Sequence, residues 1–469
     1  GARMPVRYLI HAILHAICWS ARAARTRATA PVAFALLFGS LSSGEARAVR
    51  GQQPPPLQLW FAKAGLLRGR QAAQADYPAC PLGGPGAWGP RRPGALRVLV
   101  HGAACGGVGC EAKSGSERIE GTNFGNGLRL LGHEVRFKDC GLAEGADVII
   151  ARPGAPLQEL RAGSPSAVVV AMKTDSKSQW EWVKQTDLHM ANSAIHSLFH
   201  SAHGGLDPEH AVVLRLIEVP STYWAKKLRD DPHAQMYEDI PLHRVADFKS
   251  FGAARPVRLC YHGNQYHFLE EAGLVAAVRR LAAGLGLPIE VSLIQDANDR
   301  LLQSLMGVQN LKVVQKPWTG MDATFKQLAE CDLGLVPNVE ETPNFTVNAD
   351  VGNPQINLKY KGSTNAGRAY VMAQVGLPFV TSPEPESAEL LGAAGLRSHE
   401  FLAMGTDAWT ATIAGLLRDS GRRIRASQAL RSLAERELTI ESEVVELERR
   451  IKAALSLRGK NTSTPSALL

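Results

Sequence analysis

The stretch Lys361-Gly-Ser-Thr-Asn-Ala-Gly-Arg368, continued by 369–374 and by Gly376-Leu-Pro-Phe-Val380, decides how this chain folds. It predicts a polar loop, a short helix and then a buried strand. A loop that enters a helix presents free backbone N–H groups and the positive end of the helix dipole, which together suit an anion. Lys361 and Arg368 add positive charge, so this stretch favours a phosphate or diphosphate ligand.

Strand-forming segments alternate with helical ones on both sides of this stretch. The predicted strands of the first half are 96–100, 134–137, 147–151, 167–172, 188–191 and 212–218, with a helix over 117–131 that Gly132 ends. Those of the second half are 257–261, 289–294, 311–315, 332–336 and 379–381, with helices over 268–283, 321–330 and much of 408–455. This alternation implies parallel βαβ units, so we expect two Rossmann-like α/β domains that face a cleft.

The length of 469 residues is too great for a single core. We expect a targeting segment, a linker, two domains and a helical end. The predicted boundaries are 1–48 for the signal or targeting segment, 49–95 for a Pro/Gly-rich linker, 96–250 for the N-terminal domain, 251–415 for the C-terminal domain, and 416–469 for C-terminal helices and a tail.

The first 44 residues contain no Asp or Glu, and the apolar run 31–41 follows Arg22, Arg25 and Arg27. Ala46-Arg47-Ala48 fits a small-x-small cleavage site, and the run is shorter than a membrane span. These features predict a cleaved signal peptide and the secretory pathway. An organelle transit peptide and an uncleaved anchor with peripheral membrane contact are the alternatives.

The net charge of +8 is concentrated near the N-terminus. Residues 1–96 hold 12 of the 52 Lys and Arg but only two of the 44 Asp and Glu, so the remaining 373 residues carry a net charge of −2. A nucleic-acid partner therefore loses its main support. The seven Cys show no repeated close pair, so we expect no zinc or other metal site, and Cys260 and Cys331 are interpreted as core residues.

Four loops follow predicted strands at the same edge of their sheets. They are 101–109, 262–264, 316–320 and 338–368. Ligands of open parallel sheets bind outside the carboxyl ends of the strands. The sequence therefore predicts that these loops meet around one ligand in the cleft.

Several motifs resemble the GT-B glycosyltransferases of the group 1/family 4-like kind. Ser114-Gly-Ser-Glu-Arg118 followed by Gly132-His-Glu-Val135 resembles the opening of such an enzyme, and Asp187 to Ser193 resembles a later strand. Cys331-Asp-Leu-Gly-Leu-Val-Pro337 resembles a strand of the donor domain, and 361–378 resembles the donor-phosphate loop and helix. The order and spacing agree over about 96–455, so the resemblance implies the GT-B fold.

The resemblance implies a hexosyltransferase-like enzyme that moves a sugar from a nucleotide-diphosphate donor to an unknown carbohydrate, lipid or protein acceptor. It implies no metal and no cofactor besides the nucleotide-sugar, which is a co-substrate. One departure is clear: the paired glutamates of many retaining members are replaced by Ser363 and Val371. A non-catalytic GT-B-like binding or scaffold protein and a sugar-nucleotide epimerase are the alternatives.

The candidate donor-binding residues are those that offer charge, backbone access or a ring. They are Gly263, Asn264, Trp318, Lys361, Ser363, Asn365 and Arg368. The candidate catalytic bases are Asp175 and His101, each after an apolar strand. The structural alternatives are a solvated charge for Lys361, an ion pair with a nearby Glu for Arg368, a core position for Trp318, and a cap or turn for each base.

Overall fold

A computed structural model describes residues 88, 91–101, 117–137, 144–172, 174, 179–231, 233–264, 266–269, 271, 273–294, 299–341, 358–360 and 367–462. All of these lie in one compact unit that spans 77–469. The predicted targeting segment 1–48 and most of the predicted linker 49–95 lie outside the described residues.

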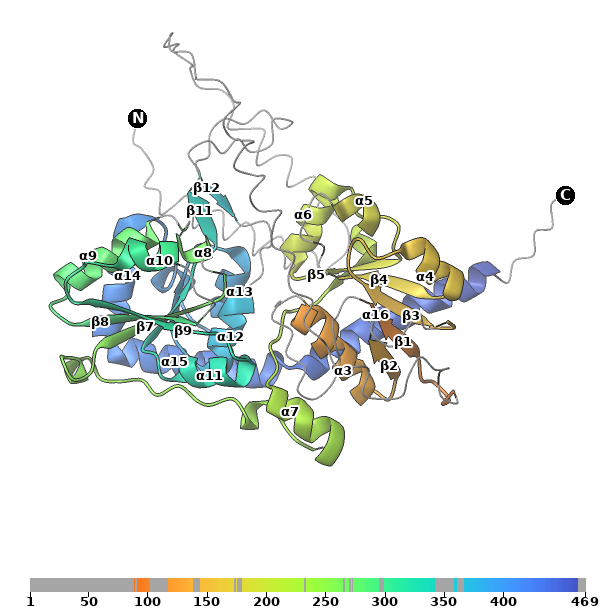
Figure 1. Cartoon of the computed structure of the whole chain (residues 1–469), viewed down its shortest axis with the longest axis horizontal. Helices are drawn as coiled ribbons and strands as arrows, with labels where there is room; N and C mark the ends of the chain where they lie inside the picture. The colour runs from red at the N-terminus through yellow and green to blue at the C-terminus, as the bar shows by residue number, and fades with distance from the viewer. Residues whose placement is uncertain are drawn as a thin grey trace, which may run out of the picture. The chain divides into compact units, whose positions relative to one another are not determined.

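Six parallel strands form the first sheet (Figure 1). In spatial order they are β2 (Glu134–Phe137), β1 (Arg97–Val100), β3 (Val148–Ala151), β4 (Val168–Ala171), β5 (Leu188–Ala191) and β6 (Ala211–Val213). These strands match the predicted ones, except that β6 ends five residues early. A turn in which Ile217 N donates to Arg215 O, at 3.0 Å, takes the chain out of the sheet there.

The second sheet has five parallel strands. In spatial order they are β13 (Phe379–Thr381), β10 (Leu333–Val336), β7 (Val257–His262), β8 (Ile289–Ile294) and β9 (Leu311–Lys316). The chain runs from β7 outward to β9 and then returns to the other side of β7 with β10. The edge between β7 and β10 is thus a topological switch point, where ligands of such sheets bind. A separate antiparallel ribbon joins β11 (Val339–Glu341) and β12 (Leu358–Tyr360).

Helices connect the strands as predicted, with one break that the sequence pattern did not show. The α-helices are α3 (Phe124–Leu130), α4 (Leu157–Gly163), α5 (Trp180–Val183), α6 (Ala194–Gly204), α7 (Ser221–Ala225), α8 (Tyr266–Leu269), α9 (Leu274–Gly284), α10 (Asp299–Leu305), α11 (Met321–Ala329), α12 (Gly367–Val375), α13 (Pro385–Ala393), α14 (Gly405–Arg418), α15 (Ser420–Glu437) and α16 (Ile440–Thr462). The predicted helix 268–283 is divided between α8 and α9, because Gly273 adopts φ +79° where a Cβ would lie 2.2 Å from Thr406 N. None of the helices in the described part of the chain has the length and apolar character of a membrane span.

The start of the first domain is held by residues at the end of the predicted linker. Trp88 Nε1 donates to Glu144 O at 2.8 Å, and the Arg136 guanidinium lies 4.8 Å from the Trp88 ring centroid. Arg91 forms an ion pair with Asp147 just before β3. These contacts show that folded structure begins a few residues before 96.

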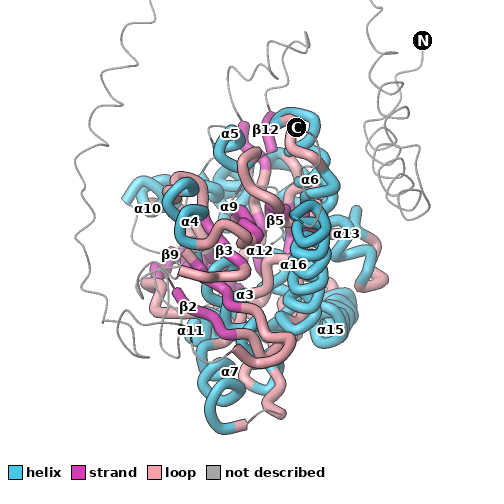
Figure 2. The backbone as a smooth tube through the Cα atoms, turned by 90° about the vertical axis from the view of Figure 1, so that its right-hand side faces the viewer, coloured by secondary structure: helices cyan, strands magenta, loops and turns pink. Residues whose placement is uncertain are grey.

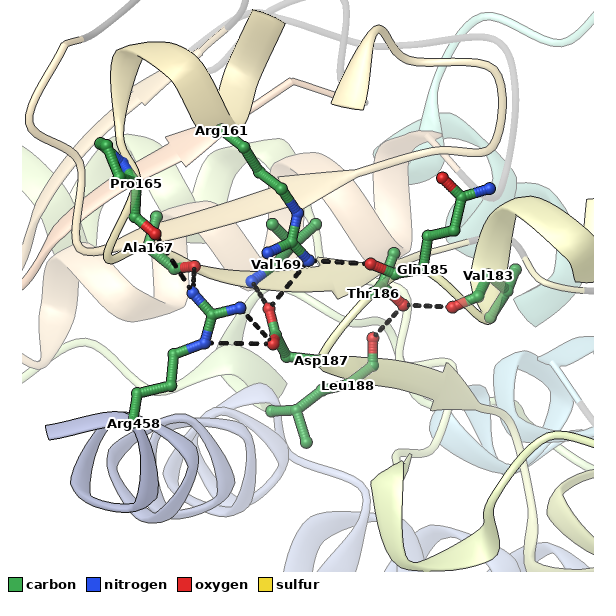
Figure 3. Close-up of polar contacts among 10 residues, drawn as sticks. All are labelled: Arg161, Pro165, Ala167, Val169, Val183, Gln185, Thr186, Asp187, Leu188 and Arg458. Atoms are coloured by element: carbon green, nitrogen blue, oxygen red, sulfur yellow. Dashed lines mark hydrogen bonds and ion pairs between the residues drawn. The ribbon is translucent and has the colours of Figure 1, made fainter. Parts of the chain in front are cut away.

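The last helix, α16, packs on the first domain, although it follows the second domain in sequence (Figures 1 and 2). Arg458, near its end, donates to Ala167 O at 2.7 Å and forms an ion pair with Asp187 at the start of β5 (Figure 3). The same carboxylate accepts from Val169 N at 2.8 Å and from Arg161. The carboxylate of Asp187, which opens one of the motifs in the sequence, therefore links β4, the start of β5 and α16.

Cys260 in β7 and Cys331 just before β10 form a disulfide between neighbouring strands. Both residues are buried, which confirms the interpretation of them as core residues. The pairing itself was not predictable, since the two are 71 residues apart in sequence. It lies two residues before the end of β7, at the switch point.

Candidate functional site

The turn after β7 brings the backbone against the side chain of Arg368. Gly263 has φ +117°, a conformation that side chains rarely adopt, and a Cβ placed there would lie 3.4 Å from Arg368 Cδ. The Arg368 guanidinium also lies 5.9 Å from the ring centroid of Tyr261, near the end of β7. The absence of a side chain at Gly263 thus leaves room for the side chain of Arg368, on α12, beside the end of β7 at the switch point.

Arg368 is bound by neutral groups. Its Nη2 donates to Pro337 O at 2.8 Å and to Asn338 Oδ1, both just after β10. Its Nε is buried and has no hydrogen-bond partner among the described residues. Among the residues that the structure describes, Arg368 makes no ion pair, so the proposed pairing with a nearby Glu is not observed. The guanidinium therefore keeps its positive charge and an unused donor at the switch point.

A second arginine reaches the same region from the first domain. Arg118 lies in a π-helical turn (Glu117–Asn123) before α3 and is buried. Its Nε donates to Glu218 Oε2 at 2.7 Å, and its Nη2 also contacts that carboxylate. Its guanidinium lies 5.1 Å from the ring centroid of Trp318, in the loop after β9. Trp318 is half-buried rather than a core residue, and its predicted stacking on a base stays a prediction.

The two arginines both act on His262, the last residue of β7. Burial, and then the positive charges of Arg368 and Arg118, lower the pKa of His262 to about 3. The ring is therefore neutral near pH 7. We call Arg118, His262, Trp318 and Arg368 the cationic site. His262, Trp318 and Arg368 come from three of the predicted loops of the second domain, whereas Arg118 comes from the first domain and lies outside them. That the loops meet around one ligand stays a prediction.

The other predicted residues fall into two groups. Asn264 is exposed, and its Oδ1 accepts from Tyr266 N at 3.0 Å, so its side chain forms a local turn. His101 follows β1, and its backbone N donates to Ile150 O at 2.8 Å.

The second group of predicted residues lies outside the described part of the chain. Its members are Lys361, Ser363, Asn365 and Asp175. The roles assigned to all of these residues stay predictions.

Sequence reasoning missed several residues of this region. His262 was part of a candidate loop without being chosen, and Arg118 was quoted only as part of a motif. Asn338 was likewise part of a candidate loop without being chosen. Glu384 and Glu386 were not considered, although Glu384-Pro-Glu386 follows the strand β13 after two intervening residues. Two nearby acidic residues after a buried strand are a usable signal, because carboxyl groups are seldom fully buried.

The described residues contain no group of three or more His, Cys, Asp or Glu arranged to hold a metal ion. Within the cationic site, Arg118 is paired with Glu218, so Arg368 is the side chain whose positive charge has no described counter-ion. Cationic side chains can stabilise a diphosphate that leaves during a reaction.

Comparison with solved structures identifies the fold. A glycosyltransferase from Rickettsia africae superimposes with a TM-score of 0.50 at 11% identity, over 77% of this chain and 99% of that one. HepE of Anabaena, solved with UDP-glucose, gives a TM-score of 0.45 at 13% identity over 77% and 100%. A putative UDP-N-acetylglucosamine 2-epimerase from Listeria monocytogenes gives 0.36 at 12% identity over 77% and 84%.

No protein-family model matches the sequence, and none of the curated proteins matches it. The first of these likenesses and the two parallel sheets show that the chain has the GT-B fold that its motifs predicted. At this identity, similarity shows the fold alone. The function has to be argued from the site.

Proposed function

We propose that this protein is a glycosyltransferase that transfers a sugar from a nucleotide-diphosphate donor to an acceptor hydroxyl without a metal ion. The observation that carries the proposal is Arg368, a guanidinium at the switch point of the second sheet whose described partners are all neutral. Arg368 is half-buried and has no counter-ion among the described residues, so its charge favours the binding of an anion. A donor diphosphate would supply it.

The proposed chemistry requires little covalent participation by the protein. As the sugar–oxygen bond breaks, negative charge develops on the leaving diphosphate, and Arg368 with the predicted Lys361 would stabilise it. Gly263 would allow the backbone to approach from the opposite side. His101 and Asp175 remain the proposed bases for the acceptor hydroxyl.

The direct test is a thermal-shift screen with UDP-, GDP-, ADP- and CMP-sugars and the matching nucleotides. A nucleoside diphosphate at one hundred times its dissociation constant is expected to stabilise the native state by about 2.7 kcal/mol. The stabilisation is expected to persist in EDTA, because the site relies on side chains. Stabilisation that appears only with Mg²⁺ or Mn²⁺ would contradict the metal-independent donor site.

Arg368→Ala is expected to weaken binding of the nucleoside diphosphate by about 1.5–3 kcal/mol, the usual contribution of a hydrogen bond to a charged group. Arg368→Lys is expected to recover part of this loss, since an ammonium offers a point charge instead of a fork. Calorimetric titration of each folded variant measures the change.

The matched control is Arg280→Ala, because Arg280 is an exposed arginine of the same domain that pairs with Asp407. This variant should bind the nucleotide as the wild type does. If Arg368→Ala keeps wild-type affinity and only lowers apo stability, Arg368 is a structural residue and the proposal loses its main support.

The second candidate function is nucleotide or sugar binding without transfer. Ser363 and Val371 favour it, because they stand where many retaining relatives carry their paired glutamates. Incubation with the stabilising nucleotide-sugar and a panel of acceptors separates the candidates. Release of free nucleoside diphosphate that depends on an acceptor indicates transfer, and an epimerised sugar without acceptor indicates an epimerase.

A further inference from the structure

Asn338 connects Arg368 to a buried carboxyl group. Its Oδ1 accepts from Arg368 Nη2, and its Nδ2 donates to Glu384 Oε2 at 2.7 Å. Its backbone N donates to Ser382 Oγ at 2.8 Å. The side-chain amide has one orientation that satisfies both neighbours, because a flipped amide would point its NH₂ at the guanidinium and its oxygen at the carboxyl group.

Glu384 belongs to a pair of buried acidic side chains. Glu384 has no exposed surface, and Glu386, 3% exposed, lies two residues later at the start of α13. Glu384 Oε2 also accepts from Ser387 Oγ at 2.7 Å, while Glu386 Oε1 accepts from Ser193 Oγ of the first domain. The remaining oxygens, Glu384 Oε1 and Glu386 Oε2, are both buried and have no hydrogen-bond donor in the described part of the chain.

We propose that Asn338 and Glu384 are positioning residues that hold the Arg368 guanidinium for an anionic ligand. The proposal rests on the proposed function, since it takes Arg368 to be the ligand of the donor diphosphate. Pro337 O and Asn338 Oδ1 both accept from Nη2, so these two contacts leave the Nη1 donors for the ligand. A fork fixed before binding loses less side-chain entropy when the diphosphate arrives.

The buried carboxyl group behind Asn338 makes this arrangement sensitive to pH. Burial and the Glu386 carboxyl raise the pKa of Glu384, and burial raises that of Glu386. The charged and titratable groups that face the pair are Arg368 and Tyr370 on α12 and Glu389 on α13. Arg368 favours the ionised pair. A diphosphate that neutralises Arg368 would therefore favour the protonated pair, and by linkage its affinity should fall as pH rises through this titration.

The experiment compares two residues that make the same contact with Glu384. Asn338 and Ser387 both donate to Glu384 Oε2 at 2.7 Å, but only Asn338 also contacts Arg368. Inorganic pyrophosphate is the probe, since it is the part common to all candidate donors. In calorimetric titrations at pH 7, Asn338→Ala is expected to weaken binding about tenfold. Ser387→Ala is expected to change it less than about twofold, because the guanidinium keeps its partner.

Glu384→Gln provides the second measurement. The amide mimics the protonated acid, so this variant should keep wild-type affinity at pH 7 and lose less affinity than the wild type between pH 7 and pH 9. Pyrophosphate also titrates in this range, but its titration affects both proteins equally. It therefore cancels when the pH dependence of affinity of Glu384→Gln is compared with that of the wild type. Glu384→Ala should weaken binding as Asn338→Ala does, and melting curves establish that each variant is folded.

Two results would overturn the inference while leaving the proposed function intact. One is equal affinity of Asn338→Ala and Ser387→Ala when Arg368→Ala has lost binding. The other is a Glu384→Gln profile that parallels the wild type. If the wild type does not bind pyrophosphate, or if Arg368→Ala binds it unchanged, the diphosphate site itself is absent and the proposed function fails.

Discussion

Arg118→Ala is expected to lower the free energy of unfolding by about 3–5 kcal/mol, the usual effect of removing one partner from a buried ion pair. The substitution leaves the Glu218 carboxylate, 4% exposed, without its guanidinium, and it removes the contact with Trp318. Urea unfolding of the folded variant measures the loss.

Arg152→Ala is the matched control, since Arg152 pairs with Glu117 at 2.6 Å but 48% of its side chain is exposed. Its loss should cost less than about 1 kcal/mol. The double variant Arg118→Met/Glu218→Leu should be more stable than either single variant, because no buried charge is left unpaired. A loss for Arg118→Ala no larger than that for Arg152→Ala would show that the Glu218 pair contributes little.

Three buried histidines are expected to make the native state unstable in mild acid. His189 on β5 packs near His200 on α6, whose ring centroid lies 3.9 Å from that of His196 on the same helix. Burial lowers the pKa of His189 and His200 to about 4 and that of His196 to about 3. The unfolded chain takes up these protons below about pH 6.5, whereas the native state does not. Stability therefore falls with pH below 6.5, by about 1.4 kcal/mol per histidine at pH 5.5, or about 4 kcal/mol in all.

The buried Glu384 has the opposite effect on the pH dependence of stability to that of the three histidines. Its raised pKa stabilises the native state as pH falls from about 8 toward 4.5, so the histidine effect is best measured as a difference between proteins. His200→Phe should lose about 1.4 kcal/mol less than the wild type between pH 7.5 and pH 5.5. His210→Gln, at an exposed position, is the control. Parallel curves for His200→Phe and the wild type would contradict the prediction.

Local patterns located most of the secondary structure. The strands β3 and β10 are continuous apolar runs, and they lie where these runs predict them. Gly132, with φ +88°, ends the helical segment as expected. The division at Gly273 was missed, because the obstacle to a continuous helix is Thr406, which is more than one hundred residues away in the chain.

The sequence by itself determined the two parallel α/β domains, the loops at the carboxyl ends of their strands and the choice of Arg368, because periodicity, turn residues and charge are local properties. Only the tertiary structure decided that α16 returns to the first domain, that Cys260 pairs with Cys331, and that Arg118 packs on Trp318. It also decided that the described partners of Arg368 are neutral, with Glu384 behind Asn338. These are contacts between distant segments, and their energies depend on burial and distance, which exist only after the chain has folded.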